Sequence, residues 1–80
     1  MRVVCITGSS SGIGLGICEK FKKEGWTVVG VSRTTNFKSE FIDLYISGDI
    51  SDVNTPKNVI DEINKVYGRL DCMKIGRAHV

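Results

Sequence analysis

The sequence contains no long apolar run and no large excess of one charge. Its 80 residues include 11 basic and 9 acidic side chains, a formal net charge of +2, which gives no electrostatic reason to expect nucleic acid or an anionic membrane as a partner. No apolar stretch approaches the length that spans a bilayer, and the first residues lack the apolar core and cleavage site of a secretory signal. These absences predict a cytoplasmic protein.

The chain has three cysteines and one histidine. Cys5, Cys18 and Cys72 are odd in number and far apart, so they match neither a disulfide framework nor a set of zinc ligands. We interpret them as small buried hydrophobic residues in a reducing compartment. The single histidine, His79, has no neighbouring motif that indicates a general base or a metal ligand. The chain is long enough for one small domain.

The clearest positive signal is a glycine-rich loop, residues 7–14, between an apolar run and an amphipathic segment. The run at residues 2–7 has no polar alternation, which predicts a strand buried on both faces of a parallel sheet. After the loop, apolar residues recur at helical spacing and charged residues take the other side. The apolar positions of this predicted helix are Ile13, Ile17, Cys18 and Phe21.

A strand, a glycine loop and a helix in this order are suited to binding a dinucleotide pyrophosphate. A phosphate at the start of a helix meets unpaired backbone N–H groups and the positive end of the helix dipole. We expect Gly8 to allow a tight turn, Gly12 to let the pyrophosphate approach the backbone, and Gly14 to let the helix pack close to the sheet. The alternative is a flexible glycine-serine turn without a ligand.

Two further apolar runs predict two more strands. One occupies residues 26–31, after Gly25 at the end of the first helix, and the other occupies residues 41–46. The polar segment between them, residues 33–40, has no helical periodicity. We therefore expect a loop or a single turn there, and the helix that a doubly wound sheet usually carries at this point is missing or vestigial.

A second helix is predicted after the third strand. Thr55 and Pro56 read as its N-cap and its first helical residue, and Gly68 ends it. Residues 70–73 look like the beginning of a fourth strand. The side of this helix that faces the core is expected to carry Val59, Ile60, Ile63, Val66 and Tyr67.

The glycine spacing resembles the T-G-x-x-x-G-I-G motif of the short-chain dehydrogenase/reductase family, and the likeness extends over residues 2–73. It implies a Rossmann-like doubly wound parallel α/β sheet, of which this chain holds the first half: three strands, the start of a fourth and two main helices. It also implies NAD(P)-dependent hydride transfer with a small carbonyl or alcohol substrate, such as a 3-oxoacyl compound or a small ketone, in a homo-oligomeric parent protein. The alternative is a Rossmann protein that senses NAD(P) without catalysis.

A second stretch that resembles the family follows the third strand at residues 48–52. In the family an aspartate here faces the adenine and the next residue offers its backbone, which makes Asp49 and Ile50 the matching positions. The alternative for Asp49 is a turn aspartate that caps its own backbone, as we expect for Asp52. The cofactor-binding residues that we predict are Gly8, Ser10, Ser11, Gly12, Ile13, Gly14, Arg33, Asp49 and Ile50.

The choice of nicotinamide cofactor depends on the end of the second strand. A carboxylate there would bind the ribose hydroxyls and repel a 2′-phosphate, but residues 31–34 contain no acid and one arginine, Arg33. A guanidinium can bind a phosphate with two hydrogen bonds, and Ser10 or Ser11 would add a hydroxyl. The sequence therefore favours NADP(H) over NAD(H), although Arg33 can also be read as a solvated loop residue.

The likeness ends after Met73, where the family continues into an Asn-Asn-Ala-Gly motif. Residues 74–80 differ from that pattern, and the catalytic asparagine, serine, tyrosine and lysine of the family match no position here. One reading frame of a common sequencing adapter translates to residues 75–80, so we interpret residues 74–80 as a non-native tail. The alternative is a genuine tail of divergent sequence, and the underlying nucleotide sequence distinguishes the two. We expect the chain alone to be inactive and poorly folded, because truncation exposes a strand edge.

Overall fold

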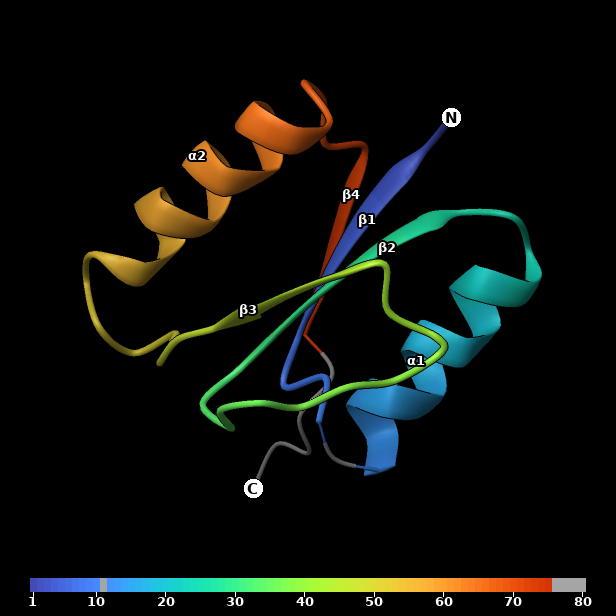
Figure 1. Ribbon diagram of the computed structural model, residues 1–80, viewed down its shortest axis with the longest axis horizontal. Coiled ribbons are helices and arrows are strands. Elements are labelled where there is room, and N and C mark those ends of the chain that lie inside the picture. Colours follow the sequence, from blue (N-terminus) through green and yellow to red (C-terminus); the bar gives the residue numbers. More distant parts are fainter. Residues whose placement is uncertain (11, 76–80) are drawn as a thin grey trace.

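The computed structural model describes residues 1–10 and 12–75. Within that part, four strands form one parallel sheet in the order β3-β2-β1-β4, which is the order of the first half of a Rossmann-type doubly wound sheet (Figure 1). The strands are β1 (Val3–Thr7), β2 (Thr27–Ser32), β3 (Leu44–Ser47) and β4 (Cys72–Ile75), and the helices are α1 (Gly12–Lys23) and α2 (Thr55–Val66).

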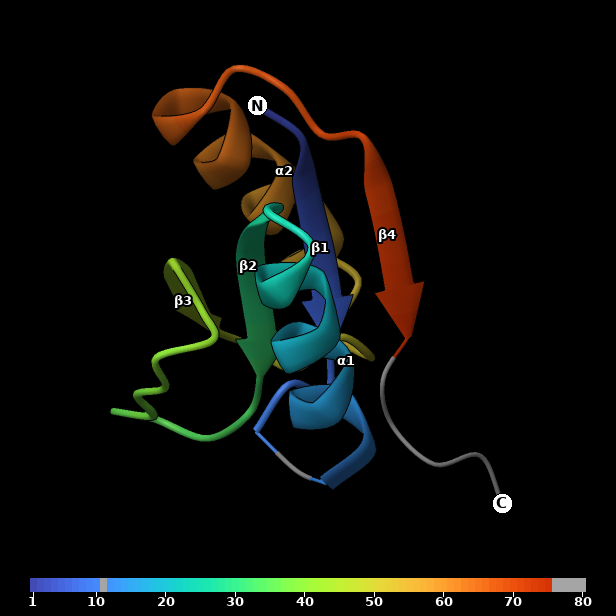
Figure 2. The ribbon, with the colours of Figure 1, turned by 90° about the vertical axis from the view of Figure 1, so that its right-hand side faces the viewer.

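One helix packs on each face of the sheet, so that the sheet lies between α1 and α2 (Figure 2). All five residues of β1 are buried, which confirms that the unbroken apolar run is a strand covered on both faces. The core consists of two hydrophobic clusters, one on each face of the sheet. Alternate residues of β1 and β2 belong to different clusters, because successive side chains of a strand point to opposite faces. The α2 face buries Val3, Cys5, Val29, Val31, Val59 and Ile63, and the α1 face buries Val4, Ile6, Cys18 and Val28.

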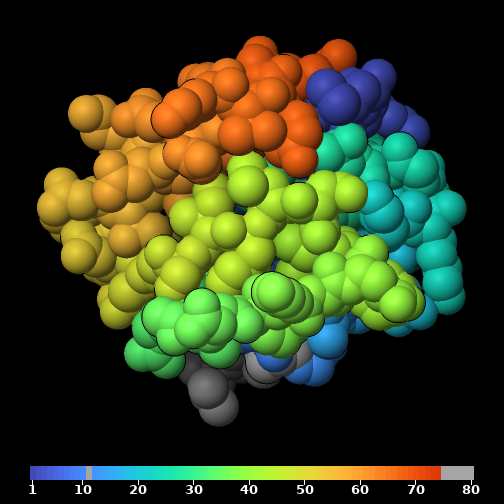
Figure 3. All heavy atoms as spheres, in the orientation of Figure 1, coloured from blue at the N-terminus to red at the C-terminus, as the bar shows by residue number. Residues whose placement is uncertain are grey.

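The connection from β2 to β3 contains no helix among its described residues, 33–43, which confirms the expected loop. The third strand is shorter than predicted and begins at Leu44 rather than at residue 41. Phe41 and Ile42 instead pack against the core cluster beneath α1, so their apolar side chains cover the sheet face that a helix would cover. This connection and β3 lie at the front of the molecule between α2 and α1 (Figure 3).

The N-cap residue of α2 differs from the predicted one. Asn54, not Thr55, is the N-cap residue, with helical backbone angles (φ −88°, ψ −19°) and no capping side-chain bond. Thr55 is the first helical residue, and its buried methyl group lies beside Gly48, where a Cβ would be 3.0 Å from it. The assignment of Thr55 as N-cap was therefore wrong because its side chain packs inward.

Three apolar residues expected to face the core are exposed instead. Ile13 is 59% exposed in the first turn of α1, and Ile60 and Val66 are 37% and 49% exposed on α2. Helix α2 packs through Val59 and Ile63, and Ile60 lies about 100° around the helix from Val59. The helical spacing of apolar residues therefore predicted a wider buried face on each helix than the sheet covers.

The free thiols follow the expectation in two of three positions. Cys5 and Cys18 are buried, and burial raises the pKa of each thiol to about 11. Cys72 is only partly buried, because β4 pairs on one side alone within the described sheet. Buried thiols with raised pKa values stay protonated and unreactive.

Two aspartates attach the outer strands to the inner ones in the same way. The Asp71 carboxylate, just before β4, accepts the backbone N–H of Val3 at 2.8 Å, and the Asp43 carboxylate, just before β3, accepts that of Val28 at 2.8 Å. The Arg69 guanidinium, followed by the Val3 amide, lowers the pKa of Asp71. Both carboxylates lie at the amino ends of the strands, which leaves the carboxyl ends open for a ligand.

Candidate functional site

The glycine loop leaves β1 in a tight turn and returns directly into α1. Gly8 has a φ of 68°, a conformation that favours glycine. A Cβ on Gly14 would lie 1.9 Å from the Gly8 carbonyl oxygen, so the first turn of α1 rests on the backbone that leaves β1. A Cβ on Gly12 would meet no atom within 4 Å. The open space lies where the sequence predicts that a pyrophosphate approaches the helix.

Ser9 is a buried part of this loop that the sequence analysis did not single out. Its amide donates to the Val31 carbonyl at 3.2 Å, and its side chain is fully buried. A Cβ on Gly30 would lie 2.7 Å from Ser9 Oγ, which means that glycine in β2 makes room for this serine. Within the described residues, Ser9 Oγ is a buried polar atom without a hydrogen-bond partner. In a run of three serines no sequence signal distinguishes the buried one.

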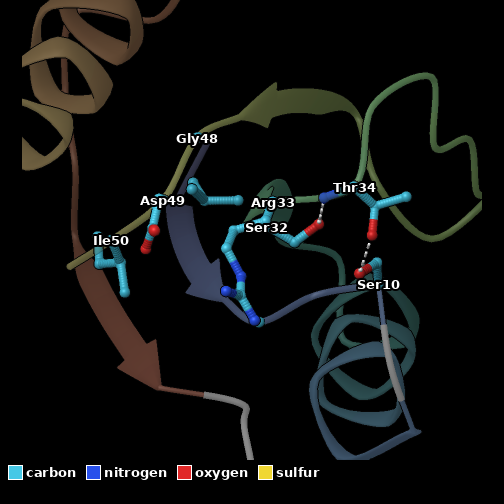
Figure 4. A pocket seen from close by; sticks show the side chains of 9 residues that line it. Ser10, Ser32, Arg33, Thr34, Gly48, Asp49 and Ile50 are labelled. Atoms are coloured by element: carbon cyan, nitrogen blue, oxygen red, sulfur yellow. Dashed lines mark hydrogen bonds between the residues drawn. The ribbon is translucent and has the colours of Figure 1, made fainter. Parts of the chain in front are cut away.

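A cleft of about 360 Å³ lies at the carboxyl ends of β1, β2 and β3. Its wall combines the glycine loop, the end of β2 and the turn after β3, and Figure 4 shows the Arg33 side chain extending into the space between Asp49 and Ser10. Ligands of open α/β sheets bind at this end of the strands. The lining residues are Gly8, Ser10, Val31, Ser32, Arg33, Thr34, Gly48, Asp49 and Ile50.

Five of the nine predicted cofactor-binding residues therefore line one cleft. They are Gly8, Ser10, Arg33, Asp49 and Ile50. Gly12, Ile13 and Gly14 form the start of α1 outside this wall, the first two exposed and the third buried. Ser11 lies outside the described residues.

Hydroxyl groups join the glycine loop to the end of β2. Ser10 Oγ and Thr34 Oγ1 are 3.1 Å apart and share a hydrogen bond (Figure 4). Tyr45 of β3, which the sequence analysis did not assign to the site, bonds through its hydroxyl to Ser32 Oγ and to the Thr34 carbonyl oxygen. Only the register of β3 beside β2 brings Tyr45 to this place.

The aspartates after β3 differ in what their carboxylates bind. Asp49 Oδ1 accepts the amide of Ser51 at 3.0 Å and its hydroxyl at 2.7 Å, so the turn-capping interpretation holds for a residue that also lines the cleft. Asp52 caps the Asn54 amide at 2.9 Å, as expected. A carboxylate held by its own turn has a fixed position at the edge of the cleft.

The donors of this site fit a dinucleotide. The positive end of α1 opens onto free space at Gly12, Arg33 supplies a guanidinium, and Ser10, Ser32 and Thr34 supply hydroxyls. Among residues 1–10 and 12–75, no three metal-ligating side chains come together. No helix in the same part of the chain is long and apolar enough to cross a membrane.

Comparison with known proteins yields one consistent family. The model of the short chain dehydrogenase family matches residues 2–77. The 1,2-dihydroxy-1,2-dihydronaphthalene dehydrogenase of a Ralstonia species is 34% identical over 85 residues, which cover 99% of this chain and 32% of that protein. The chain thus spans about a third of the length of this relative.

Solved structures of similar sequence share the fold. L-sorbose reductase from Gluconobacter frateurii, solved with NADPH and L-sorbose, superposes with a TM-score of 0.85 and 30% identity over 99% of this chain and 34% of that one. The 3-ketoacyl-(acyl-carrier-protein) reductase from Brucella melitensis, solved with NADH, gives a TM-score of 0.81 and 29% identity over 90% of this chain and 32% of that one.

Proposed function

Because the chain belongs to the short-chain dehydrogenase family, we propose that it forms the cofactor-binding part of an NADP(H)-preferring oxidoreductase that acts on a small carbonyl or alcohol. One observation carries the proposal: the glycine loop, Arg33 and Asp49 come from three separate segments and share one cleft. The bound nicotinamide would supply or accept the hydride. The residues of this chain bind the cofactor and orient it.

The preference for NADP(H) rests on the charges at the end of β2. Arg33 is exposed on the cleft wall, and the segment 31–34 carries no carboxylate that would repel a 2′-phosphate. The acid of the cleft, Asp49, comes from the turn after β3 and is held there by Ser51. A guanidinium flanked by hydroxyls is suited to a phosphate ester. NAD(H), bound without this contact, is the weaker ligand.

The proton-transfer step is assigned to residues outside this sequence. The chain spans 32% of the Ralstonia 1,2-dihydroxy-1,2-dihydronaphthalene dehydrogenase, and we propose that none of the serines and tyrosines of this chain takes a catalytic position of the family. We therefore propose a ketone or alcohol substrate, with 3-oxoacyl compounds and small ketones as the first to assay with NADPH. We also propose that residues 74–80 are a non-native tail. The structure describes residues 74 and 75 of this segment.

Titration of the protein that carries this sequence with NADPH and NADH tests the proposal. Arg33→Ala should weaken NADPH about tenfold to 100-fold, the range of one charge-assisted hydrogen-bonding contact, and leave NADH within about twofold. Arg2→Ala is the matched control, because it removes a guanidinium that stacks on Trp26 at the opposite end of β1. Equal affinity of the unmodified protein for both cofactors would overturn the preference, and failure to bind either would overturn the cofactor role.

A further inference from the structure

Tyr45 does not line the cofactor cleft, but it forms hydrogen bonds with two residues that do. The residue lies in β3 opposite Gly30 of β2, is partly buried, and packs its ring on Phe37 with 5.5 Å between the ring centres. Its hydroxyl contacts Ser32 and Thr34, which line the cleft, whereas Tyr45 itself does not. Its influence on a ligand must therefore pass through these two residues.

The hydrogen bonds at this point form a closed ring whose direction can be assigned. Tyr45 donates to the Thr34 carbonyl oxygen, which uses the only proton of the phenol. Ser32 must then donate to Tyr45 Oη, and Ser32 Oγ accepts the Thr34 amide at 3.3 Å. Each hydroxyl in the ring donates once and accepts once, an arrangement in which the bonds strengthen one another.

The ring fixes the backbone on both sides of Arg33. Ser32 precedes Arg33 and is 8% exposed, and Thr34 follows it and is bonded through its own hydroxyl to Ser10 of the glycine loop. We propose that Tyr45 is a positioning residue that presets Arg33 for the 2′-phosphate of NADPH through this ring. The inference rests on the proposed function, since it names what sets the cofactor preference of the same cleft.

A phenylalanine at position 45 would keep the ring packing and remove only the hydroxyl. The Thr34 carbonyl would lose its donor, and the Ser32 hydroxyl would lose its acceptor inside a largely buried position. The segment around Arg33 would then sample more conformations before phosphate binds. Ordering it on binding would weaken NADPH, whereas NADH makes no 2′-phosphate contact and would be little affected.

The test compares Tyr45→Phe with Tyr67→Phe in the protein that carries this sequence, by titration with NADPH and with NADH. Tyr67 lies at the end of α2 and outside the cleft wall, so its variant controls for the loss of a phenol. We expect Tyr45→Phe to raise the Kd for NADPH about tenfold, comparable to one or two net hydrogen bonds, and the Kd for NADH less than about twofold. Tyr67→Phe should change neither.

A second readout needs no cofactor. The Thr34 amide donates to Ser32 Oγ within the ring, so its hydrogen exchange should accelerate in Tyr45→Phe and stay unchanged in Tyr67→Phe. An equal loss of NADPH and NADH affinity, or an unchanged ratio between them, would overturn the inference. If the unmodified protein binds neither cofactor, the proposed function fails, while the exchange of Thr34 still reports on the ring by itself.

Ser32→Ala removes a different hydroxyl of the same ring. This variant tests the inference if Tyr45→Phe does not fold. The same selective loss of NADPH affinity is expected. Where Tyr45→Phe does fold, adding it to Ser32→Ala should cost much less affinity than it costs alone, because the ring is already open. Additive losses in the double variant would refute a shared ring.

Discussion

Three glycines within one turn and a half of helix should respond differently to the same added methyl group. Gly14 rests on the Gly8 carbonyl, with 1.9 Å between its hypothetical Cβ and that oxygen, whereas Gly16 and Gly12 have no atom within 4 Å. Gly14→Ala, Gly16→Ala and Gly12→Ala therefore separate packing, helix propensity and ligand contact. All three substitutions are chemically identical.

The expected magnitudes follow from two opposing terms. Alanine is about 1 kcal/mol more favourable than glycine within a helix, so Gly16→Ala should stabilise the protein by about that amount. At Gly14 the new methyl group is about 1.6 Å short of the ~3.5 Å at which such atoms rest. The methyl group would meet the backbone of Gly8 and Ser9 rather than a side chain that can move, and overpacking of this kind costs about 3 kcal/mol, the upper end of its usual range. The net loss at Gly14 is about 2 kcal/mol, and the two variants should differ by about 3 kcal/mol.

Urea unfolding followed by far-ultraviolet circular dichroism measures these differences as shifts of the midpoint at constant slope. Gly12→Ala should leave the midpoint nearly unchanged but weaken NADPH by at least about tenfold, because its methyl group enters the space proposed for the pyrophosphate. If Gly14→Ala stabilised the protein as much as Gly16→Ala does, helix α1 would not be seated on the Gly8 carbonyl, and the description of the loop would be wrong.

Two further predictions concern Asp71 and the three cysteines. The pKa of Asp71 is lowered by Arg69 and by the Val3 amide. The stabilising effect of its carboxylate is therefore present above about pH 4, the pKa of an aspartate in the unfolded chain, and is lost as the pH falls through the lowered pKa. Asp71→Asn should make the acid-induced loss of stability in urea titrations less steep, and an equally steep loss would contradict the assignment. With pKa values of about 11, Cys5 and Cys18 should react with iodoacetamide at pH 8 about 100-fold more slowly than an unperturbed thiol. Labelling followed by mass spectrometry should find Cys72 modified first, and faster labelling of Cys5 would show that β1 is not buried as described.

Much of the fold could be predicted from local patterns. The unbroken apolar run predicted a doubly covered β1, and the polar segment before β3 correctly indicated a missing helix. Errors arose where a residue had two possible uses. Phe41 and Ile42 were assigned to a strand although they cover the sheet, and Thr55 was assigned to a cap although it packs against Gly48. Composition and spacing cannot separate these uses, because each depends on what lies nearby in space.

The candidate site divides in the same way. Gly8, Ser10, Arg33, Asp49 and Ile50 were predicted by motif and position, and the structure brings them to one cleft. Ser9 and Tyr45 were not predicted. Ser9 is buried because Gly30 leaves room for it, and Tyr45 reaches Ser32 because β3 pairs with β2 in one particular register. Their roles come from contacts between segments distant in the sequence.

By itself, the sequence determined most of the elements, the family and the glycine loop between β1 and α1, because hydrophobic periodicity and glycine spacing act over a few neighbouring residues. The tertiary structure decided which face each helix covers, that Gly14 rests on Gly8, and that a tyrosine of the third strand holds both neighbours of Arg33. These features required the parallel strands to be paired first. Only the pairing brings the carboxyl ends of β1, β2 and β3 together around one cleft.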